Sequence, residues 1–464
     1  MSARYKLIGA ALACLLVGAG LPAASSAGVR PFISPTPRPT NALERPTDHP
    51  DPNRNEYTVR QAPRSPACGP HFCVHWVAKG PDAPNLKDSD ADGVPDYVER
   101  VLSTAEYVYS VENGALGWQP PKPDGKLGGG KDKTDIYLLQ LGGALFGYAA
   151  PDQGQASKEH RLPRRLYGYL VLDNNYARSE FPGTKQGNDL EVTLAHEYNH
   201  ILQFGYDAFQ DTWFAEATAT WMEDQVYGEV NDYLRYVHSW VRGYDTPVAG
   251  NDYREYGSAV WNHWLAARYG PEIIRSAWER AIHFKPAGFS VAAYDSAIRA
   301  AGSSNFNRDF ALFSRDVAEW RIEEAFGEGN LYPDVPRQGG LSTSPSAPPV
   351  ERSLNHTTFQ LLRVDAPAGK AVVVRAKAPG GVAAALALVG RVGPERSGYT
   401  VSDTRYKPRG GWMQVKLEDP GAYNRITAVV VNADTKAIGF DPRRLDWGYT
   451  GDGEPFKIKA RVVR

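Results

Sequence analysis

The stretch LEVTLAHEYNHILQFG, residues 190–205, decides how the rest of this 464-residue chain is interpreted. It contains the pattern HEYNH at residues 196–200, an HExxH motif, and no proline interrupts it. Asn188, followed three residues later by Glu191, is typical of a helix start with a capping-box partner. Gly205 is a suitable C-terminal stop. The stretch therefore predicts one long helix that carries the motif.

On a helix, residues four apart lie one above the other on the same face. His196 and His200 would then point at one place, with Glu197 beside them. Two neutral imidazoles are good zinc ligands, and the glutamate could take a proton from a zinc-bound water and pass it on. The competing interpretation is that these are ordinary buried or surface histidines, because the motif is short and the chain has ten histidines.

A second helix supplies the missing ligand. Residues 211–223, DTWFAEATATWME, predict a helix with Asp211 as its N-cap. Glu216 lies in its first turns and would complete a site of two histidines and one carboxylate that leaves a position open for water. Glu223 lies two turns further on the same face. It is either an alternative ligand or a group that orients a ligand.

HExxH followed by a WxxEAxAxWxE helix resembles the gluzincin-type zinc metalloproteases, the clan that includes thermolysin. More narrowly, residues 68–285 resemble secreted bacterial metalloproteases that carry an upstream DxDxDGxPDYVE segment. The resemblance implies zinc, peptide-bond hydrolysis, Glu197 as general base, and His196, His200 and Glu216 as ligands. Thermolysin-type enzymes place the third ligand in a different local motif at longer spacing, so substrate details do not transfer.

The resemblance also implies an oxyanion-stabilising donor downstream of the third ligand. Tyr256 is the first candidate, with Tyr253 and His263 as alternatives, although aromatic residues at helical spacing are more often part of the core. Proteases of this type hold the substrate backbone against an edge strand of the sheet. Two segments, 134–143 and 166–175, predict strands, and the second, directly before the helix, is expected to offer this edge.

The segment DSDADGVPDYVE, residues 88–99, follows the pattern of an EF-hand calcium loop. Alternating acidic residues let one tight turn direct several oxygens at a hard cation, and the glycine at position 6 permits the bend. The expected calcium ligands are Asp88, Asp90, Asp92, Val94 through its carbonyl, Asp96 and Glu99. The loop leads into a predicted helix, residues 95–114, so the alternative is an acidic turn that caps this helix without metal. Any calcium here would be structural.

The N-terminus predicts secretion. Residues 1–27 combine a positive start, an apolar run and small residues suited to cleavage, as in a signal peptide. Residues 28–66 are rich in proline and polar residues and predict a disordered leader or a pro-segment that buries little. Cys68 and Cys73 are expected to form a disulfide in an oxidising compartment, and a metal site is the alternative. The protein is therefore expected to be extracellular.

Composition limits the remaining function classes. The net charge of −1 gives no indication of nucleic-acid binding or of attraction to an anionic membrane. No segment after the signal is apolar for long enough to predict a transmembrane span. A Pro/Ser-rich linker, residues 336–350, precedes short alternating runs in 351–464 that predict a β-sandwich, with contact to a cell surface or a polysaccharide as its expected role. We therefore expect an α+β fold in which residues 67–335 form a zincin-like catalytic domain.

The functional hypothesis is a secreted zinc-dependent endopeptidase that acts on proteins or peptides. Two alternatives remain open. One is a non-catalytic binding or adhesion protein built on a zincin scaffold, against which the intact set of His196, Glu197, His200 and Glu216 argues. The other is a zinc hydrolase of a non-peptide substrate.

Overall fold

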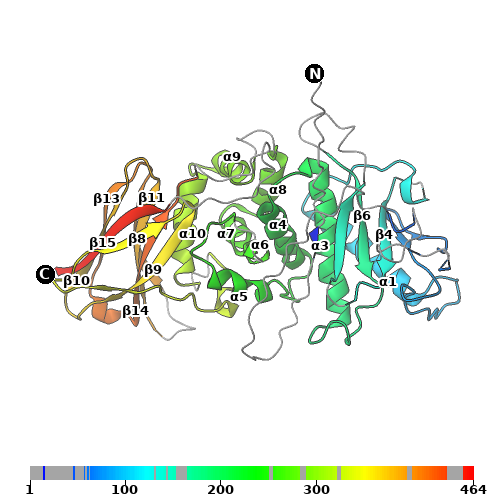
Figure 1. Cartoon of the computed structure of the whole chain (residues 1–464), viewed down its shortest axis with the longest axis horizontal. Helices are drawn as coiled ribbons and strands as arrows, with labels where there is room; N and C mark the ends of the chain where they lie inside the picture. The colour runs from blue at the N-terminus through cyan, green and yellow to red at the C-terminus, as the bar shows by residue number, and fades with distance from the viewer. Residues whose placement is uncertain are drawn as a thin grey trace, which may run out of the picture. The chain divides into compact units, whose positions relative to one another are not determined.

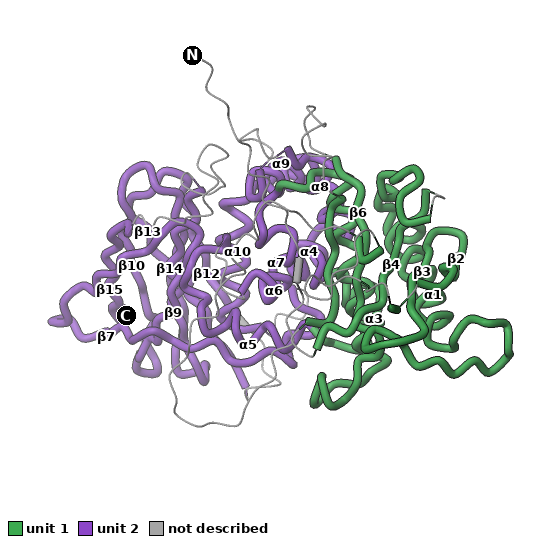
Figure 2. Tube along the Cα trace, turned by 45° about the vertical axis from the view of Figure 1, so that its right-hand side comes forward, with its two compact units in different colours: residues 1–209, 222–232 green, residues 210–221, 233–464 purple. Residues whose placement is uncertain are grey.

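A computed structural model gives the fold of the chain. It describes residues 14–15, 45–47, 57, 60–61, 63–129, 132–142, 145–152, 165–249, 254–282, 289–320, 325–393, 400–435 and 453–463. The predicted signal segment therefore lies outside the described residues except for Cys14–Leu15. The chain is mixed α and β and divides into two compact units (Figure 2): residues 1–209 with 222–232, and residues 210–221 with 233–464.

The first unit is organised around a six-stranded sheet of order β1-β5-β6-β4-β3-β2. Its strands are β1 Cys14–Leu15, β2 Ala67–Cys68, β3 Phe72–His75, β4 Thr134–Leu139, β5 Gly147–Pro151 and β6 Gly168–Asp173. β3, β4 and β6 run parallel, and β5 is antiparallel to β6. β4 and β6 are buried along their whole length, as expected for strands covered on both faces.

The position of β5 corrects one expectation from the sequence. The strand directly before the long helix, β6, lies inside the sheet between β5 and β4, so it offers no free edge. The edge belongs to β5, whose sequence GYAAP carries too little β-branched or aromatic character to signal a strand. Among the described strands, only β6 and the two-residue β1 pair with β5.

Two helices cover one face of this sheet (Figure 1): α1, Asp96–Tyr109, and α3, Gln186–Asp207. α3 starts two residues before the expected Asn188 cap and continues past Gly205. Both ends therefore differ from the sequence prediction by two or three residues. α3 lies so close to β5 that a Cβ on Gly147 would come within 2.8 Å of the side chain of Thr193. Glycine permits this approach.

The opposite face of the sheet is covered in part by the leader. Tyr57 is 2% exposed and packs in a cluster with the sheet residues Tyr137, Tyr148 and Tyr169. Its hydroxyl lies 2.9 Å from the carbonyl of Leu138. The sequence predicted that residues 28–66 bury little, whereas the described part of this segment contributes to the core of the first unit.

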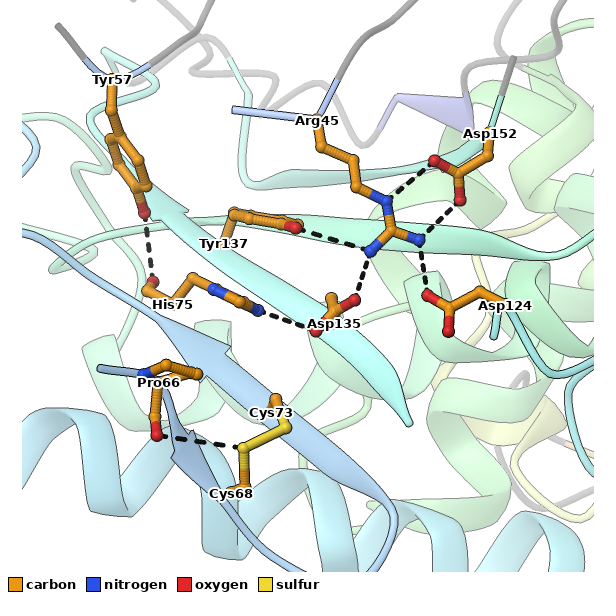
Figure 3. A network of polar contacts seen from close by, with 10 residues as sticks. All are labelled: Arg45, Tyr57, Pro66, Cys68, Cys73, His75, Asp124, Asp135, Tyr137 and Asp152. Atoms are coloured by element: carbon orange, nitrogen blue, oxygen red, sulfur yellow. Dashed lines mark hydrogen bonds and ion pairs between the residues drawn. A yellow bond between two sulfur atoms is a disulfide. The ribbon is translucent and has the colours of Figure 1, made fainter. Parts of the chain in front are cut away.

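Arg45, also in the leader, is 1% exposed and lies among three aspartates (Figure 3). Its guanidinium donates to Asp124 at 2.6 Å, to Asp152 at 2.7 Å, and to Asp135. Asp135 also bonds Nε2 of His75 at 2.7 Å. One arginine thus compensates the charge of several largely buried carboxylates. The predicted Cys68–Cys73 disulfide is confirmed and links β2 to β3 in the same unit.

The second unit contains helices followed by two sheets. The helices are α5 Leu234–Arg242, α6 Arg254–Gly257, α7 Ala259–Tyr269, α8 Glu272–Glu279, α9 Val291–Ala301 and α10 Phe306–Val317. The helix α4, Thr212–Val226, begins in this unit, and its last residues belong to the first unit. Within the described residues, no helix combines the length and apolar character needed to cross a membrane.

The C-terminal strands form two sheets of order β13-β10-β15-β8 and β12-β11-β14-β9-β7. Their bounds are β7 Gly340–Ser342, β8 Val350–Leu354, β9 Thr358–Asp365, β10 Ala371–Ala378, β11 Ala384–Arg391, β12 Thr400–Lys407, β13 Gly411–Leu417, β14 Arg425–Asn432 and β15 Glu454–Val463. One apolar cluster draws side chains from both sheets, including Val374, Leu386 and Val430. The two sheets therefore share a core, which is the arrangement of a sandwich.

The helices and the sandwich of the second unit pack against each other. α10 packs against β11, β12 and β14. Phe359 of β9 contacts Trp240 and Phe310 with ring centroids 6.5 and 6.3 Å apart. The segment expected to be a linker, residues 336–350, contains β7. Arg337, in the same segment, pairs with Glu319 at 2.9 Å. This stretch is therefore part of the packed structure.

Candidate metal centre

The HEYNH sequence lies in the buried middle of α3. His196, Glu197 and His200 are each 0% exposed, because the helix packs against β5, β6 and α1. Glu216, on α4, is 3% exposed. Each of His196, His200 and Glu216 offers one ligand atom, and these three atoms all lie within 4.8 Å of one another. The structure thus brings together the three residues that the sequence assigned to a metal.

A carboxylate orients the first histidine. Nδ1 of His196 lies 2.6 Å from Oε1 of Glu223, and both side chains are buried. A carboxylate accepts hydrogen bonds, so Nδ1 carries the proton and Nε2 keeps its lone pair for a metal. Of the two roles left open for Glu223, this contact favours that of the orienting group.

A neutral amide orients the second histidine. Nδ1 of His200 lies 2.9 Å from Oε1 of Gln203, one turn further along α3. Nε2 of Gln203 donates to Oδ1 of Asn199 at 2.8 Å, and Nδ2 of Asn199 donates to Glu112 at 2.8 Å. This relay of four side chains is buried throughout. It leaves Nε2 of His200 as the ligand atom by the same argument.

Glu112 is the last side chain of this relay. It lies in a π-helical turn, Ser110–Ala115, directly after α1. Burial raises the pKa of Glu112 well above its ordinary value, and the hydrogen bond from Asn199 opposes the rise. The next residue, Asn113, accepts a 2.7 Å bond from the hydroxyl of Tyr198 in the motif. π-helical turns are often found at functional sites. This one holds the side chains of Glu112 and Asn113 against the motif helix.

Contacts within the second unit hold the part of α4 that carries Glu216. Nδ2 of Asn262 donates to the carbonyl of Ala217 at 3.0 Å, and Nε1 of Trp278 donates to Oγ1 of Thr218 at 3.0 Å. Asp211 precedes the helix, as the sequence predicted. Burial raises its pKa to about 7, while hydrogen bonds from Ser290, Trp213 and the Thr212 backbone oppose the rise.

The candidate oxyanion donors lie in the second unit. Tyr256, in α6, is 7% exposed and stacks on Tyr236 with ring centroids 5.0 Å apart. His263, in α7, lies against Tyr233 at 4.6 Å, and burial lowers its pKa to about 3. His263 is therefore neutral near pH 7. Tyr253 lies outside the described residues, and the role of Tyr256 stays a prediction.

The acidic loop at residues 88–99 is compact. Carboxylate oxygens of Asp88, Asp90 and Asp92 lie within 4.8 Å of one another. Gly93 has φ +93°, the conformation for which glycine was expected. Glu99 has a raised pKa, from desolvation and then from the charges of Asp90 and Asp92.

Asp96 behaves differently from the other expected calcium ligands. It begins α1, and its carboxylate accepts bonds from Lys87 at 2.9 Å and from the backbone of Ser89 at 2.7 Å. These bonds lower its pKa to about 2. Among the described residues, Asp96 is not part of the grouping formed by Asp88, Asp90 and Asp92, and Val94 lies two residues before the start of α1.

The sequence pattern missed the residues that orient the ligands. Gln203, Asn199 and Glu112 belong to no motif. Gln203 contacts His200 and Asn199 within α3, and Glu112 reaches Asn199 from 87 residues away. A further side chain near the motif is Tyr176, fully buried, whose backbone has φ +46°. Its pKa is raised by burial and, to a smaller extent, by nearby charges that include Glu197.

Comparison with known proteins adds a family match. Residues 181–332 match a family that is described as a family of unknown function (DUF6055). The matched segment contains the motif helix, Glu216, Tyr256 and the helices around them. It contains neither the acidic loop nor the C-terminal strands. No curated protein matches this chain.

Proposed function

We propose that this protein is a secreted zinc-dependent endopeptidase with a zincin-like catalytic region. The observation that carries the proposal is the grouping of His196, His200 and Glu216 within 4.8 Å. Two imidazoles and one carboxylate are the donor set of catalytic zinc sites with an open fourth position. The groups bound to Nδ1 of each histidine support the same assignment, because they leave Nε2 as the ligand atom.

Zinc would supply a Lewis acid that polarises the scissile carbonyl and makes water more acidic. Glu197, adjacent to His196 on α3 and fully buried, would take the proton of the attacking water. It would then return that proton to the amine of the leaving peptide. A carboxylate is suited to both steps, because it can accept one proton as a base and then donate the same proton as an acid.

The sheet supports a peptide substrate. β5 is antiparallel to β6, and its other side is paired only with Cys14–Leu15 among the described strands. These two residues belong to the predicted signal segment, which the mature protein would lack. An extended peptide could then add to β5 through backbone hydrogen bonds.

The test is casein hydrolysis by the purified mature chain. We expect cleavage that a chelator abolishes and added zinc restores. Glu197→Gln should keep bound zinc and lose nearly all activity, because an amide cannot take the proton. Glu191→Gln, a less buried acid on the same helix, is the matched control and should keep full activity.

Two outcomes would contradict this function. Normal turnover by Glu197→Gln would remove Glu197 as the base. If the purified chain bound one zinc ion per molecule but cleaved no protein substrate, a non-peptide hydrolase or a binding protein would be favoured.

We also propose that the loop at residues 88–99 binds calcium and stabilises the start of α1. The grouping of Asp88, Asp90 and Asp92 supports this, and Glu99 stands beside them. Calcium should raise the thermal unfolding midpoint of the mature protein. Asp90→Asn should remove most of that rise, while the exposed Glu229→Gln should leave it intact. If calcium raised the unfolding midpoint of both variants by the same amount, the proposed calcium site would be contradicted.

A further inference from the structure

The four-stranded sheet of the sandwich has one face in the core and one face in solvent. Strand residues alternate between the two, so Val374, Val415 and Ile458 are buried while their neighbours point outward. The outward side chains form what we call the basic face. Its exposed members are Trp412, Gln414 and Lys416 of β13, Arg375 and Lys377 of β10, and Lys457, Lys459 and Arg461 of β15.

The strand register brings like charges together on this face. Lys377 lies opposite Lys457, and Arg375 lies opposite Lys459. Cross-strand partners are close neighbours, and two cations in such positions repel each other. At the outward positions of these four strands, the described residues include one acid, Glu351, which pairs with Lys457 at 3.0 Å. Folding alone gives no reason for such an arrangement.

Most of the cations on the basic face have no acidic partner. Lys416 pairs with Glu418 at 2.5 Å, directly after β13. Within the described part of the chain, no ion pair is formed by Arg375, Lys377, Lys459 or Arg461. Their charge is therefore available to a ligand, and it stands out in a chain whose net charge is −1.

An exposed tryptophan lies among these cations. Trp412 is 55% exposed, although large apolar side chains are usually covered. The guanidinium of Arg375 lies 4.8 Å from its ring centroid, and the ammonium of Lys377 lies 6.0 Å from it. Both cations are thereby held beside the indole ring. The indole ring and the cations beside it together offer a ligand an apolar surface next to positive charge.

We propose that the basic face binds an acidic polysaccharide. The C–H face of a sugar ring would pack on Trp412, and carboxylate or sulfate groups along the chain would pair with Arg375, Lys377 and Lys459. A ligand with many negative charges is favoured, because the basic face is positively charged. A single-stranded nucleic acid fits less well, because such strands stack successive bases on several aromatic side chains. The outward positions of these strands carry Trp412 as their one aromatic residue.

The experiment measures binding of the full mature chain to polygalacturonate and to dextran sulfate, with uncharged dextran as the blank. We expect salt-sensitive binding to at least one of the two polyanions. The triple variant Arg375→Gln/Lys377→Gln/Lys459→Gln should weaken it by about tenfold or more. Trp412→Ala should weaken it at unchanged charge. A matched triple variant elsewhere in the sandwich, Lys370→Gln/Arg405→Gln/Arg409→Gln, should bind as the unmodified protein does.

A stability measurement separates binding from folding. The triple variant on the basic face removes repulsion between exposed cations, so its unfolding midpoint should stay the same or rise. Three results would overturn the proposal: no binding to either polyanion, equal losses in both triple variants, or tighter Trp412-dependent binding to single-stranded DNA or to anionic lipid vesicles. None of these measurements depends on peptidase activity.

Discussion

The two histidines of HEYNH look equivalent in the sequence and differ in the group that orients each. Glu223 accepts from His196 with a carboxylate, whereas Gln203 accepts from His200 with a neutral amide. A charged acceptor favours the proton on Nδ1 more strongly than an amide does. His196 should therefore depend more on its partner than His200 does.

Replacing Glu223 tests this difference. Glu223→Leu removes the acceptor of the His196 proton and should lower zinc affinity by about 10- to 100-fold. Glu223→Gln keeps an acceptor oxygen and should recover most of that loss. Zinc competition with a chromogenic chelator measures both. Equal losses in the two variants would show that His196 requires the negative charge of Glu223, and that an acceptor oxygen alone does not replace it.

Asp211 predicts a dependence of stability on pH. Burial raises its pKa to about 7, above the value of about 4 in an unfolded chain. The folded state therefore binds the proton more tightly, and this contribution to stability is lost as the pH rises from about 4 through 7. Asp211→Asn keeps a capping side chain that stays neutral.

The Asp211→Asn variant should be more stable than the unmodified protein at pH 8 and similar to it at pH 4. Urea unfolding at both pH values measures the difference. If the variant were less stable at pH 8, Asp211 of the unmodified protein would be ionised at that pH and its charge would stabilise the folded state.

At the scale of elements, the leader segment matters more than its composition suggests. Its proline-rich sequence has little apolar surface, yet Arg45 and Tyr57 are buried against the first sheet. Arg45 contacts Asp124, Asp135 and Asp152, which lie 79, 90 and 107 residues away from it in the sequence. A sequence pattern cannot show that three such acids share one cation.

Breaking the Arg45 cluster should destabilise the first unit. Arg45→Met leaves three largely buried carboxylates without their cation, a loss of about 3–5 kcal/mol for a buried ion pair. Arg60→Met, in an exposed part of the same segment, should change stability by about 0.5 kcal/mol or less. Urea unfolding of both variants gives the comparison. Similar stabilities would mean that the aspartates are satisfied without Arg45.

At the scale of the whole molecule, the helices of the second unit and the sandwich depend on one another. Phe359 of β9 packs against Trp240, Tyr244 and Phe310 of the helical part. Arg425 of β14 donates to both carboxylate oxygens of Glu319 at 2.7 Å. The interface combines aromatic burial with a paired charge, as in the interior of a domain.

Removal of the sandwich should therefore disrupt the helical part. A chain that ends at residue 335 would expose the aromatic side chains of α5 and α10 and should be insoluble or aggregate. The single change Phe359→Ala in the full chain should cost about 3–5 kcal/mol of stability. A soluble truncated protein with a cooperative unfolding transition would show that the two parts fold independently.

The sequence by itself determined the features that lie within a few residues of one another. HEYNH predicts two histidines on one helix face because a helix repeats every 3.6 residues. The short spacing of Cys68 and Cys73 predicts their disulfide, and alternating runs predict most of the C-terminal strands. Each of these follows from local geometry that any helix, strand or short loop shares.

The tertiary structure alone decided which distant residues meet. It placed Glu223 on His196, connected Glu112 to His200 through Asn199 and Gln203, and moved the sheet edge from β6 to β5. It also aligned Lys377 with Lys457 around an exposed tryptophan. Except for the two contacts of Gln203 within α3, these contacts join residues far apart in the sequence. They are fixed by how helices and strands pack, and packing depends on the whole chain rather than on any one stretch of it.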